Sequence, residues 1–198
     1  QILRKKPADL IWIQKQGLLA VKLAQIFALR PDIIGEKKCQ QLQKLYQHAA
    51  SIPSENLFKT IEEKAPKDFM NHFSEIDEEP LAAASVGQVH KAKLNSGEEV
   101  VIKFIKSSNA LTFKKEVNKM KKWLKILLIF TPKLRRVGNP MALLNHVSDY
   151  TLRELDLTNE IKGANELNKI KDDVKSSFLM ELLRFPKYYE DLSNKDIL

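Results

Sequence analysis

The sequence predicts an α+β protein, in which helices precede a small antiparallel sheet and further helices follow it. Two observations carry this prediction. Apolar residues in the first third recur at the three- and four-residue spacing of helices. Around residues 81–106 the pattern changes to the two-residue period of strands, with a turn sequence at Asn95-Ser96-Gly97. We therefore expect a helical part over residues 1–77 and a mixed part over residues 78–198.

Helices are expected throughout the first part. Residues 8–30 are apolar nearly all round, which predicts a largely buried helix that ends before Pro31. Residues 36–50 are amphipathic, and a further helix is expected after an N-cap at Ser54. The apolar faces of these two helices consist of Cys39, Leu42, Leu45, Tyr46 and Ala49, and of Leu57, Phe58 and Ile61.

The second part begins with a short strand and a hairpin. Residues 112–129 then predict a basic helix, and residues 141–170 predict one long polar helix. The tail from Phe185 has the pattern of further strand pairing. In the second strand of the hairpin, EVVIKFI, one face carries Val100, Ile102 and Phe104, and the other carries Val101, Lys103 and Ile105.

Composition limits the classes of function. The net charge of +8 comes from 33 basic and 25 acidic residues. That excess favours phosphates, anionic lipid or nucleic acid, although a lysine-rich solvated surface explains it as well. The longest apolar run, near residues 123–130, is far shorter than the ~20 residues of a membrane span. The single cysteine, Cys39, excludes an internal disulfide and fits a reducing compartment. Because the first residue is Gln1, we expect the natural amino terminus, with any targeting signal, to lie outside this sequence.

Lys103 is the first residue whose position indicates chemistry. It alternates with Val101 and Ile105 on the inner face of an apolar strand, where an ammonium needs a carboxylate or phosphate partner. The alternative is an edge-strand lysine that reaches solvent. The segment VVIK closely matches the V-A-I-K strand of kinases, whose lysine contacts nucleotide phosphates and a helix glutamate.

An alanine run precedes this strand, in the place of a glycine-rich loop. Glycine-rich loops bind phosphate because the missing Cβ atoms let backbone N–H groups approach the phosphate oxygens. Alanine methyl groups should stiffen such a loop and narrow its pocket, while Ser85 adds a hydroxyl and Gly87 keeps one permissive position. A plain buried strand of small residues is the alternative. The alanines are Ala82, Ala83 and Ala84.

Together, the segments PLAAASVGQVHKAKL and GEEVVIK resemble the signature of the UbiB family of atypical kinases, also called aarF-domain-containing kinases. That family has an alanine-rich loop in place of the glycine-rich one. The resemblance covers about residues 10–198 and implies a protein-kinase-like N-lobe, with a helical extension in front of it. It also implies nucleotide contacts from Ala82, Ala83, Ala84, Ser85, Gly87, Gln88 and Lys103.

The helical extension carries a second family motif, K-x-G-Q, which is often followed by R-P-D. The segment AVKLAQIFALRPD supplies Lys22 and Gln25 of this motif, but Ala24 stands where the family has glycine. This departure puts the exact packing of the extension in doubt. Lys22 and Gln25 are three residues apart and share a helix face among apolar neighbours. They need polar partners there, unless Lys22 reaches the surface along its own stem.

Residues 152–160, LRELDLTNE, supply a third match, to the E-x-D motif and later glutamate of the helix equivalent to kinase helix C. The resemblance implies that Glu160 pairs with Lys103, whereas Glu154, with Asp156, meets Lys22. Glu154 and Glu160 are six residues apart, about 240° around a helix, so they cannot serve one partner. A solvated acidic helix face is the alternative.

Two functions follow as expectations. The resemblance implies the amino-terminal portion of an atypical kinase or ATPase that supports ubiquinone (coenzyme Q) biosynthesis at a quinone-containing membrane. ATP and Mg²⁺ are expected for the full-length protein. The sequence lacks a catalytic loop and the D-F-G metal ligand, so we expect the C-lobe to be absent, with no catalytic residue and no metal ligand in this chain. The alternative is a truncated, inactive relative that serves as a scaffold subunit of a membrane-associated assembly.

The basic helix bears on the partners. Over residues 113–136, an apolar stripe beside dense lysines suits an anionic membrane, although a helix packed on its apolar side explains the pattern as well. Nucleic acid is not expected, because no aromatic platform or base-reading motif accompanies the charge. We expect the partner to be a membrane or a membrane-associated protein assembly. Quinone-biosynthesis proteins are candidate members of that assembly. In a eukaryote, the expected location is the matrix side of the mitochondrial inner membrane. The stripe consists of Phe113, Val117, Met120, Leu124 and Leu127.

Overall fold

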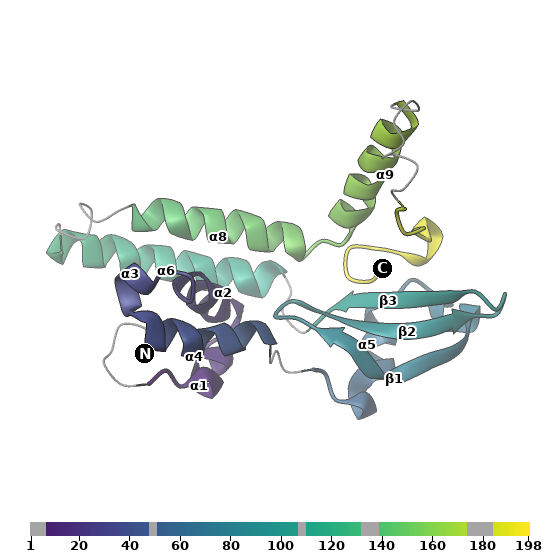
Figure 1. Cartoon of the computed structure of the whole chain (residues 1–198), viewed down its shortest axis with the longest axis horizontal. Coiled ribbons are helices and arrows are strands. Elements are labelled where there is room, and N and C mark those ends of the chain that lie inside the picture. The colour runs from purple at the N-terminus through teal and green to yellow at the C-terminus, as the bar shows by residue number, and fades with distance from the viewer. Residues whose placement is uncertain (1–6, 48–50, 107–109, 132–138, 174–183) are drawn as a thin grey trace. The chain divides into compact units, whose positions relative to one another are not determined.

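The computed structural model describes residues 7–47, 51–106, 110–131, 139–173 and 184–198. They form helices and an antiparallel sheet of strand order β1-β2-β3, which confirms the predicted α+β class (Figure 1). The chain divides into two compact units, and the segments of the two units alternate along the sequence. The sequence predicts one boundary, after residue 77. Unit 1 comprises Gln1–Ile52, Ala82–Gln88 and Lys106–Leu152, and unit 2 comprises Pro53–Leu81, Val89–Ile105 and Arg153–Leu198.

The first helix predicted for unit 1 is interrupted. The expected single helix over residues 8–30 is wrong at Gly17, where a φ of 103° separates two helices. The segment is also not buried all round, since Ile11 and Trp12 are exposed. Pro31 begins a new short helix and does not end the previous one. The four helices are α1 (Leu10–Lys15), α2 (Leu18–Phe27), α3 (Pro31–Ile34) and α4 (Glu36–Gln47).

A small core joins these helices, and α2 packs against α4 within it. Gln25 Nε2 donates a hydrogen bond to the Leu45 carbonyl at 3.2 Å. The Tyr46 hydroxyl donates to the Gln25 carbonyl at 2.9 Å, and this bond leaves the predicted core residue Tyr46 half exposed. The core cluster consists of Ile13, Ala24, Ala28, Leu42 and Leu45. The predicted Ala49 lies outside the described residues.

Among the described residues, α6 (Ala110–Phe130) and most of α8 (Pro140–Glu154) also belong to unit 1. Glu116 of α6 accepts a hydrogen bond from the Leu19 N–H at 3.1 Å, so its carboxylate caps the amino end of α2. A Cβ atom at Gly17 would collide with that carboxylate, which explains a glycine at this point beyond its positive φ. In the described part of the chain, no helix has both the length and the apolar character needed to cross a membrane.

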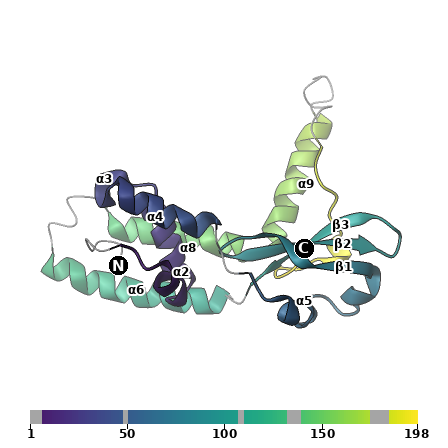
Figure 2. The same ribbon diagram turned by 60° about the horizontal axis from the view of Figure 1, so that its bottom comes forward.

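Most of the sheet belongs to unit 2, with α5 (Leu57–Lys64) and α9 (Thr158–Asp173) on opposite sides of it (Figure 2). The strands are β1 (Phe73–Ala83), β2 (Gly87–Leu94) and β3 (Glu99–Ile105). The predicted N-cap at Ser54 is wrong, because Ser54 opens a short 3₁₀ helix and α5 begins only at Leu57. The 3₁₀ helices are η1 (Ser54–Asn56), η2 (Phe69–His72) and η3 (Glu190–Leu192).

The strand faces alternate as predicted, but the face with Ile102 and Phe104 is the more buried one, and on the Lys103 face Ile105 is buried while its neighbours are not. Ile102 and Phe104 are fully buried, whereas Val101 is exposed and the Lys103 side chain is 34% exposed. The expectation of an inner-face lysine is therefore wrong, since Lys103 lies on the open face of the sheet. The predicted turn is confirmed: Gly97 has a φ of 89°, and its N–H donates to the Leu94 carbonyl.

The carboxyl-terminal tail pairs with β3, which confirms the predicted strand pairing. An antiparallel bridge joins Phe104 and Ile197. Lys103 and Leu198 exchange backbone hydrogen bonds of 2.7 and 2.8 Å, and the Ile105 N–H donates to the Asp196 carbonyl at 2.9 Å. The tail thereby protects the edge of the strand that carries Lys103.

The long helix predicted over residues 141–170 is wrong, because α8 and α9 are separate helices. Asp156 Oδ1 accepts hydrogen bonds from the Thr158 N–H at 3.1 Å and the Thr158 hydroxyl at 2.6 Å. Such local side-chain bonds compete with continued helix and favour a helix start. Glu154 therefore ends α8 while Glu160 lies in the first turn of α9, so the separation of 240° on one helix does not apply.

Candidate functional site

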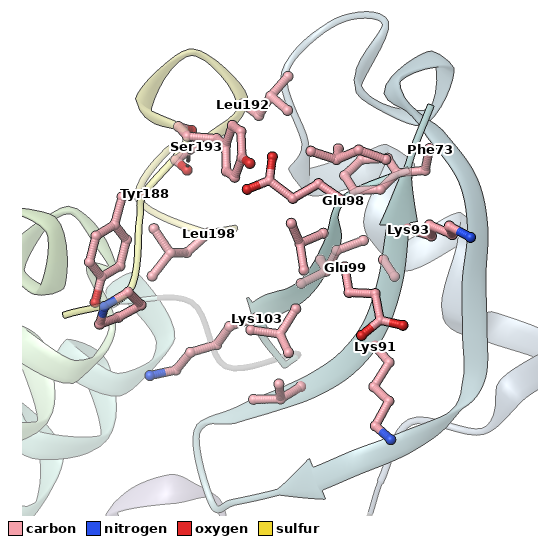
Figure 3. Close-up of a pocket in the computed structure, with 18 of the residues that line it drawn as sticks. Phe73, Lys91, Lys93, Glu98, Glu99, Lys103, Tyr188, Leu192, Ser193 and Leu198 are labelled. Atoms are coloured by element: carbon pink, nitrogen blue, oxygen red, sulfur yellow. Dashed lines mark hydrogen bonds between the residues drawn. The ribbon is translucent and has the colours of Figure 1, made fainter. Parts of the chain in front are cut away.

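A pocket of about 840 Å³ lies on the open face of the sheet in unit 2 (Figure 3). Odd-numbered residues of the strands form most of its floor, because alternate side chains of a strand share a face. Glu160 of α9 and residues of the segment 186–193 also line the pocket. In Figure 3, Lys103 and Lys91 project from the strands, and Tyr188 projects from the carboxyl-terminal segment.

The structure brings together Lys103 and Glu160, as the resemblance implied. Their ammonium and carboxylate form an ion pair between β3 and α9. The Asp156 bonds to Thr158 start α9 two residues before Glu160, so they fix where this glutamate projects. The side chains of Lys103 and Glu160 are 34% and 42% exposed. The ammonium, which has three donor positions, can therefore also bind a second anion that enters from solvent.

Apolar side chains line the same pocket as the ion pair. Leu81, Val89 and Val101 come from the three strands in turn. Leu81 and Val101 are more than half exposed, although apolar side chains of this size are usually buried in a folded domain. An apolar surface beside a cation is suited to a ligand with a flat apolar ring and an anionic group.

A cluster at another part of the pocket was missed by the sequence analysis. Lys187 Nζ donates to the Tyr189 hydroxyl at 3.1 Å and lies 3.6 Å from the Glu98 carboxylate. The hydrogen bond from Tyr189, followed by the charge of Lys187, lowers the pKa of Glu98. The cluster ties the carboxyl-terminal segment to the β2–β3 hairpin. Glu98 lies in the GEEVVIK segment, but the resemblance gives it no role, and Lys187 and Tyr189 are far from it in the sequence, so no sequence signal brings the three together.

The predicted phosphate loop lies in unit 1 by its contacts. The Ala84 N–H donates to the Gly87 carbonyl at 2.8 Å and closes the connection between β1 and β2. Ala82 and Ala84 are exposed, Ala83 and Ser85 are half-buried, and Gly87 is buried. The nucleotide contacts of these residues remain predictions.

Gln88 differs from the rest of the loop because its side chain is fully buried. Its Oε1 accepts a hydrogen bond from the Ile52 N–H at 2.7 Å, and its Nε2 donates to the Ile52 carbonyl at 3.5 Å. The amide thus satisfies both backbone groups of one residue in the segment before η1. In this structure Gln88 anchors the loop, and its predicted role toward nucleotide remains a prediction.

The extension residues have partners within unit 1. Lys22 Nζ lies 5.8 Å from the centre of the Tyr150 ring, within the range of a cation–π contact. Gln25 is buried and bonds to α4. Glu154 and Asp156 belong to unit 2, so their predicted contacts with Lys22 remain predictions.

Within the described ranges, no group of three or more His, Cys, Asp or Glu side chains could hold a metal ion. Mg²⁺ prefers carboxylates and phosphates around an octahedral site. The described residues therefore supply no cluster of acids for Mg²⁺, whereas the Lys103 ammonium can bind an anionic group of a ligand.

The comparisons with known proteins identify the family. The model of the ABC1 atypical kinase-like domain matches residues 44–198. The chain belongs to the UbiB family of ABC1 atypical kinase-like proteins. This confirms the resemblance that the alanine run and the strand lysine indicated.

Bacterial relatives of this UbiB-family chain are named "Probable protein kinase UbiB". The protein from Pseudomonas fluorescens Pf0-1 is 34% identical over 160 residues, which cover 79% of this chain and 29% of the relative. The protein from Histophilus somni is 30% identical over 194 residues, which cover 94% of this chain and 34% of the relative. The chain therefore spans about a third of the length of these relatives.

A solved structure is also similar to this UbiB-family chain. It is the complex of Rv3197 from Mycobacterium tuberculosis with erythromycin, with 25% sequence identity and a TM-score of 0.44. The match covers 69% of this chain and 33% of that protein.

Proposed function

We propose that this UbiB-family chain provides the nucleotide-binding part of an atypical kinase or ATPase that acts in ubiquinone biosynthesis. The observation that carries the proposal is the ion pair of Lys103 and Glu160 beside a pocket with apolar walls. In kinases, a strand lysine held by a helix glutamate binds the nucleotide phosphates. Glu160 would hold the ammonium in position, and the phosphates of ATP would bind its free side.

The apolar wall would receive the base of the nucleotide. Leu81, Val89 and Val101 offer a surface without hydrogen-bonding groups, against which a planar ring can pack. The pocket volume of about 840 Å³ lies within the usual range of small-molecule sites, roughly 300–1,000 Å³. Mg²⁺ would neutralise charge between the phosphates, and its ligands would come from residues other than those described.

The setting of this activity is part of the same proposal. Relatives that bear the name UbiB support the family, and the family resemblance implies a quinone-containing membrane. We propose a membrane or membrane-associated assembly as the partner, which in a eukaryote is the matrix side of the mitochondrial inner membrane. Quinone-biosynthesis proteins are the candidate partners within such an assembly.

Replacement of Lys103 tests the nucleotide site. In the full-length protein, Lys103→Ala should weaken Mg-ATP binding by about tenfold or more, because a hydrogen bond to a charged group contributes about 1.5–3 kcal/mol. Isothermal titration calorimetry measures this affinity. Lys59→Ala, on α5 and outside the pocket lining, is the matched control and should bind ATP as the wild type does.

Two results would count against the proposal. Unchanged ATP affinity in a folded Lys103→Ala protein would remove Lys103 from the site. A wild-type protein that binds no ATP would favour the alternative of an inactive scaffold subunit.

A further inference from the structure

Helix α6 carries an apolar face that neither the core nor the nucleotide pocket uses. Phe113 and Val117 of the predicted stripe are buried in unit 1, so this part of the stripe packs inward. Further along α6, apolar residues recur at spacings of three and four and are exposed. They are Met120, Trp123, Leu127 and Phe130, with exposures of 40%, 63%, 47% and 78%.

Cations accompany this exposed face. Lys115, Lys119 and Lys122 are exposed and follow the same helical spacing, so they form a row along one side of it. The sequence between Glu116 and Asp149 contains no acidic residue. Its basic residues are Lys119, Lys121, Lys122, Lys125, Lys133, Arg135 and Arg136, which account for most of the net charge of +8.

The exposed apolar residues and the lysine row of α6, taken together, favour one class of partner over the others. A protein groove would accept the apolar residues, but it gives no reason for a long stretch without acids. Nucleic acid would accept the lysines, but not an aliphatic and aromatic face of this kind. An anionic bilayer accepts both, because apolar side chains enter the boundary of the acyl chains while lysines reach lipid phosphates. Tryptophan is the side chain that favours this boundary most clearly.

We propose that this face of α6 docks the protein on an anionic lipid bilayer. The helix lies in the plane of the membrane surface. Met120, Trp123, Leu127 and Phe130 insert below the headgroups, and Lys115, Lys119 and Lys122 contact lipid phosphates. The inference rests on the membrane setting proposed above, and it adds the docking surface and the lipid chemistry.

Vesicle flotation of the full-length protein tests the surface. The protein should float with mixed phosphatidylcholine–phosphatidylglycerol vesicles more than with phosphatidylcholine alone, and added salt should reduce the difference. The Trp123→Ser/Phe130→Ser variant should lose most of this binding. Leu29→Ser is the matched control, because Leu29 is 64% exposed in the same unit but lies outside α6.

A charge variant tests the lysine row independently. Lys119→Gln/Lys122→Gln should weaken binding to the mixed vesicles by about fivefold for each lysine. Lys59→Gln/Lys67→Gln removes the same charge from exposed positions outside α6 and should have little effect. Amide hydrogen exchange locates the contact, since residues 118–131 should exchange more slowly with anionic vesicles and not with neutral ones.

Three results would overturn the docking surface. The first is equal flotation of the wild type and the Trp123→Ser/Phe130→Ser variant. The second is a loss of binding only in the lysine variant, which would indicate charge attraction without insertion. The third is a wild type that self-associates, together with a Trp123→Ser/Phe130→Ser variant that is monomeric but still floats with the vesicles. That result would indicate that the face forms a contact between copies of the chain. ATP binding by each variant separates these results from failure of the nucleotide site, because the α6 face lies outside the pocket lining.

Discussion

The carboxylate of Glu98 has two partners that each favour its ionised form. The hydrogen bond from Tyr189 lowers its pKa most, and Lys187 lowers it further through its charge. Because the folded pKa lies below the ordinary value, the stabilisation is present above the ordinary glutamate pKa and is lost as the pH falls through the lowered one. The bond between the hairpin and the carboxyl-terminal segment should therefore weaken in acid.

An NMR titration of Glu98 checks this expectation. Tyr189→Phe removes the donor while keeping the ring, so the Glu98 pKa should rise toward its ordinary value. Tyr188→Phe removes the neighbouring hydroxyl, which is not among the causes of the shift, and should leave the titration unchanged. If Tyr189→Phe also leaves it unchanged, Tyr189 is not the residue that lowers the pKa.

The Lys103–Glu160 pair could be predicted from the sequence, whereas the cluster of Glu98, Lys187 and Tyr189 could not. Lys103 and Glu160 each stand in a recognisable motif, so their pairing could be predicted from family resemblance. Glu98 lies in the GEEVVIK segment without a role implied by the resemblance, and its proximity to Lys187 and Tyr189 arises only when the tail folds back onto the hairpin. The exposure of Lys103 was also not predictable, because strand alternation separates two faces without showing which one is covered.

Among the elements, α9 has a start that depends on one side chain. Asp156 satisfies the Thr158 N–H and hydroxyl, and Glu160 follows in the first turn. Asp156→Ala should destabilise the protein by about 0.5–2 kcal/mol, the usual cost of losing a helix cap. It should also weaken ATP binding, because Glu160 would no longer hold Lys103 in one position.

Urea unfolding and ATP titration measure these two effects. Asp149→Ala removes an exposed aspartate from α8 and should change neither. An Asp156→Ala protein with wild-type stability and wild-type ATP affinity would show that the position of Glu160 does not depend on this cap.

The helices themselves were largely predictable, whereas their interruptions were not. The apolar pattern continues through Gly17, so periodicity alone joins α1 and α2 into one helix. The cap of α2 comes from Glu116, 97 residues away from Leu19 in the sequence. A local pattern cannot contain such a distant partner. The break at Asp156 was missed for a different reason, since an aspartate within a polar helix looks like an ordinary solvated residue.

On the scale of the whole molecule, the two compact units are assembled from alternating segments. A change of periodicity along the sequence predicts a single boundary between two continuous parts. In the structure, each unit instead consists of three separate segments of the chain. Periodicity reports local structure, and only tertiary contacts decide which segments form a compact unit. The charge is also unevenly distributed, since most of the excess lies between Glu116 and Asp149.

Metal binding is a property of the whole protein. The described residues contain no group of three or more acidic, histidine or cysteine side chains that could hold a metal ion. The chain spans about a third of the length of its relatives, so we expect the Mg²⁺ ligands to come from the remainder of the full-length protein. Residues 1–198 alone should bind ATP weakly through Lys103, and EDTA should not change that affinity. In the full-length protein, EDTA should lower the affinity, because Mg²⁺ neutralises charge between the phosphates. Calorimetry of both proteins with and without EDTA measures the difference, and a thermal melt shows that the shorter one is folded. Strong, EDTA-sensitive binding by residues 1–198 would place the metal ligands within this chain.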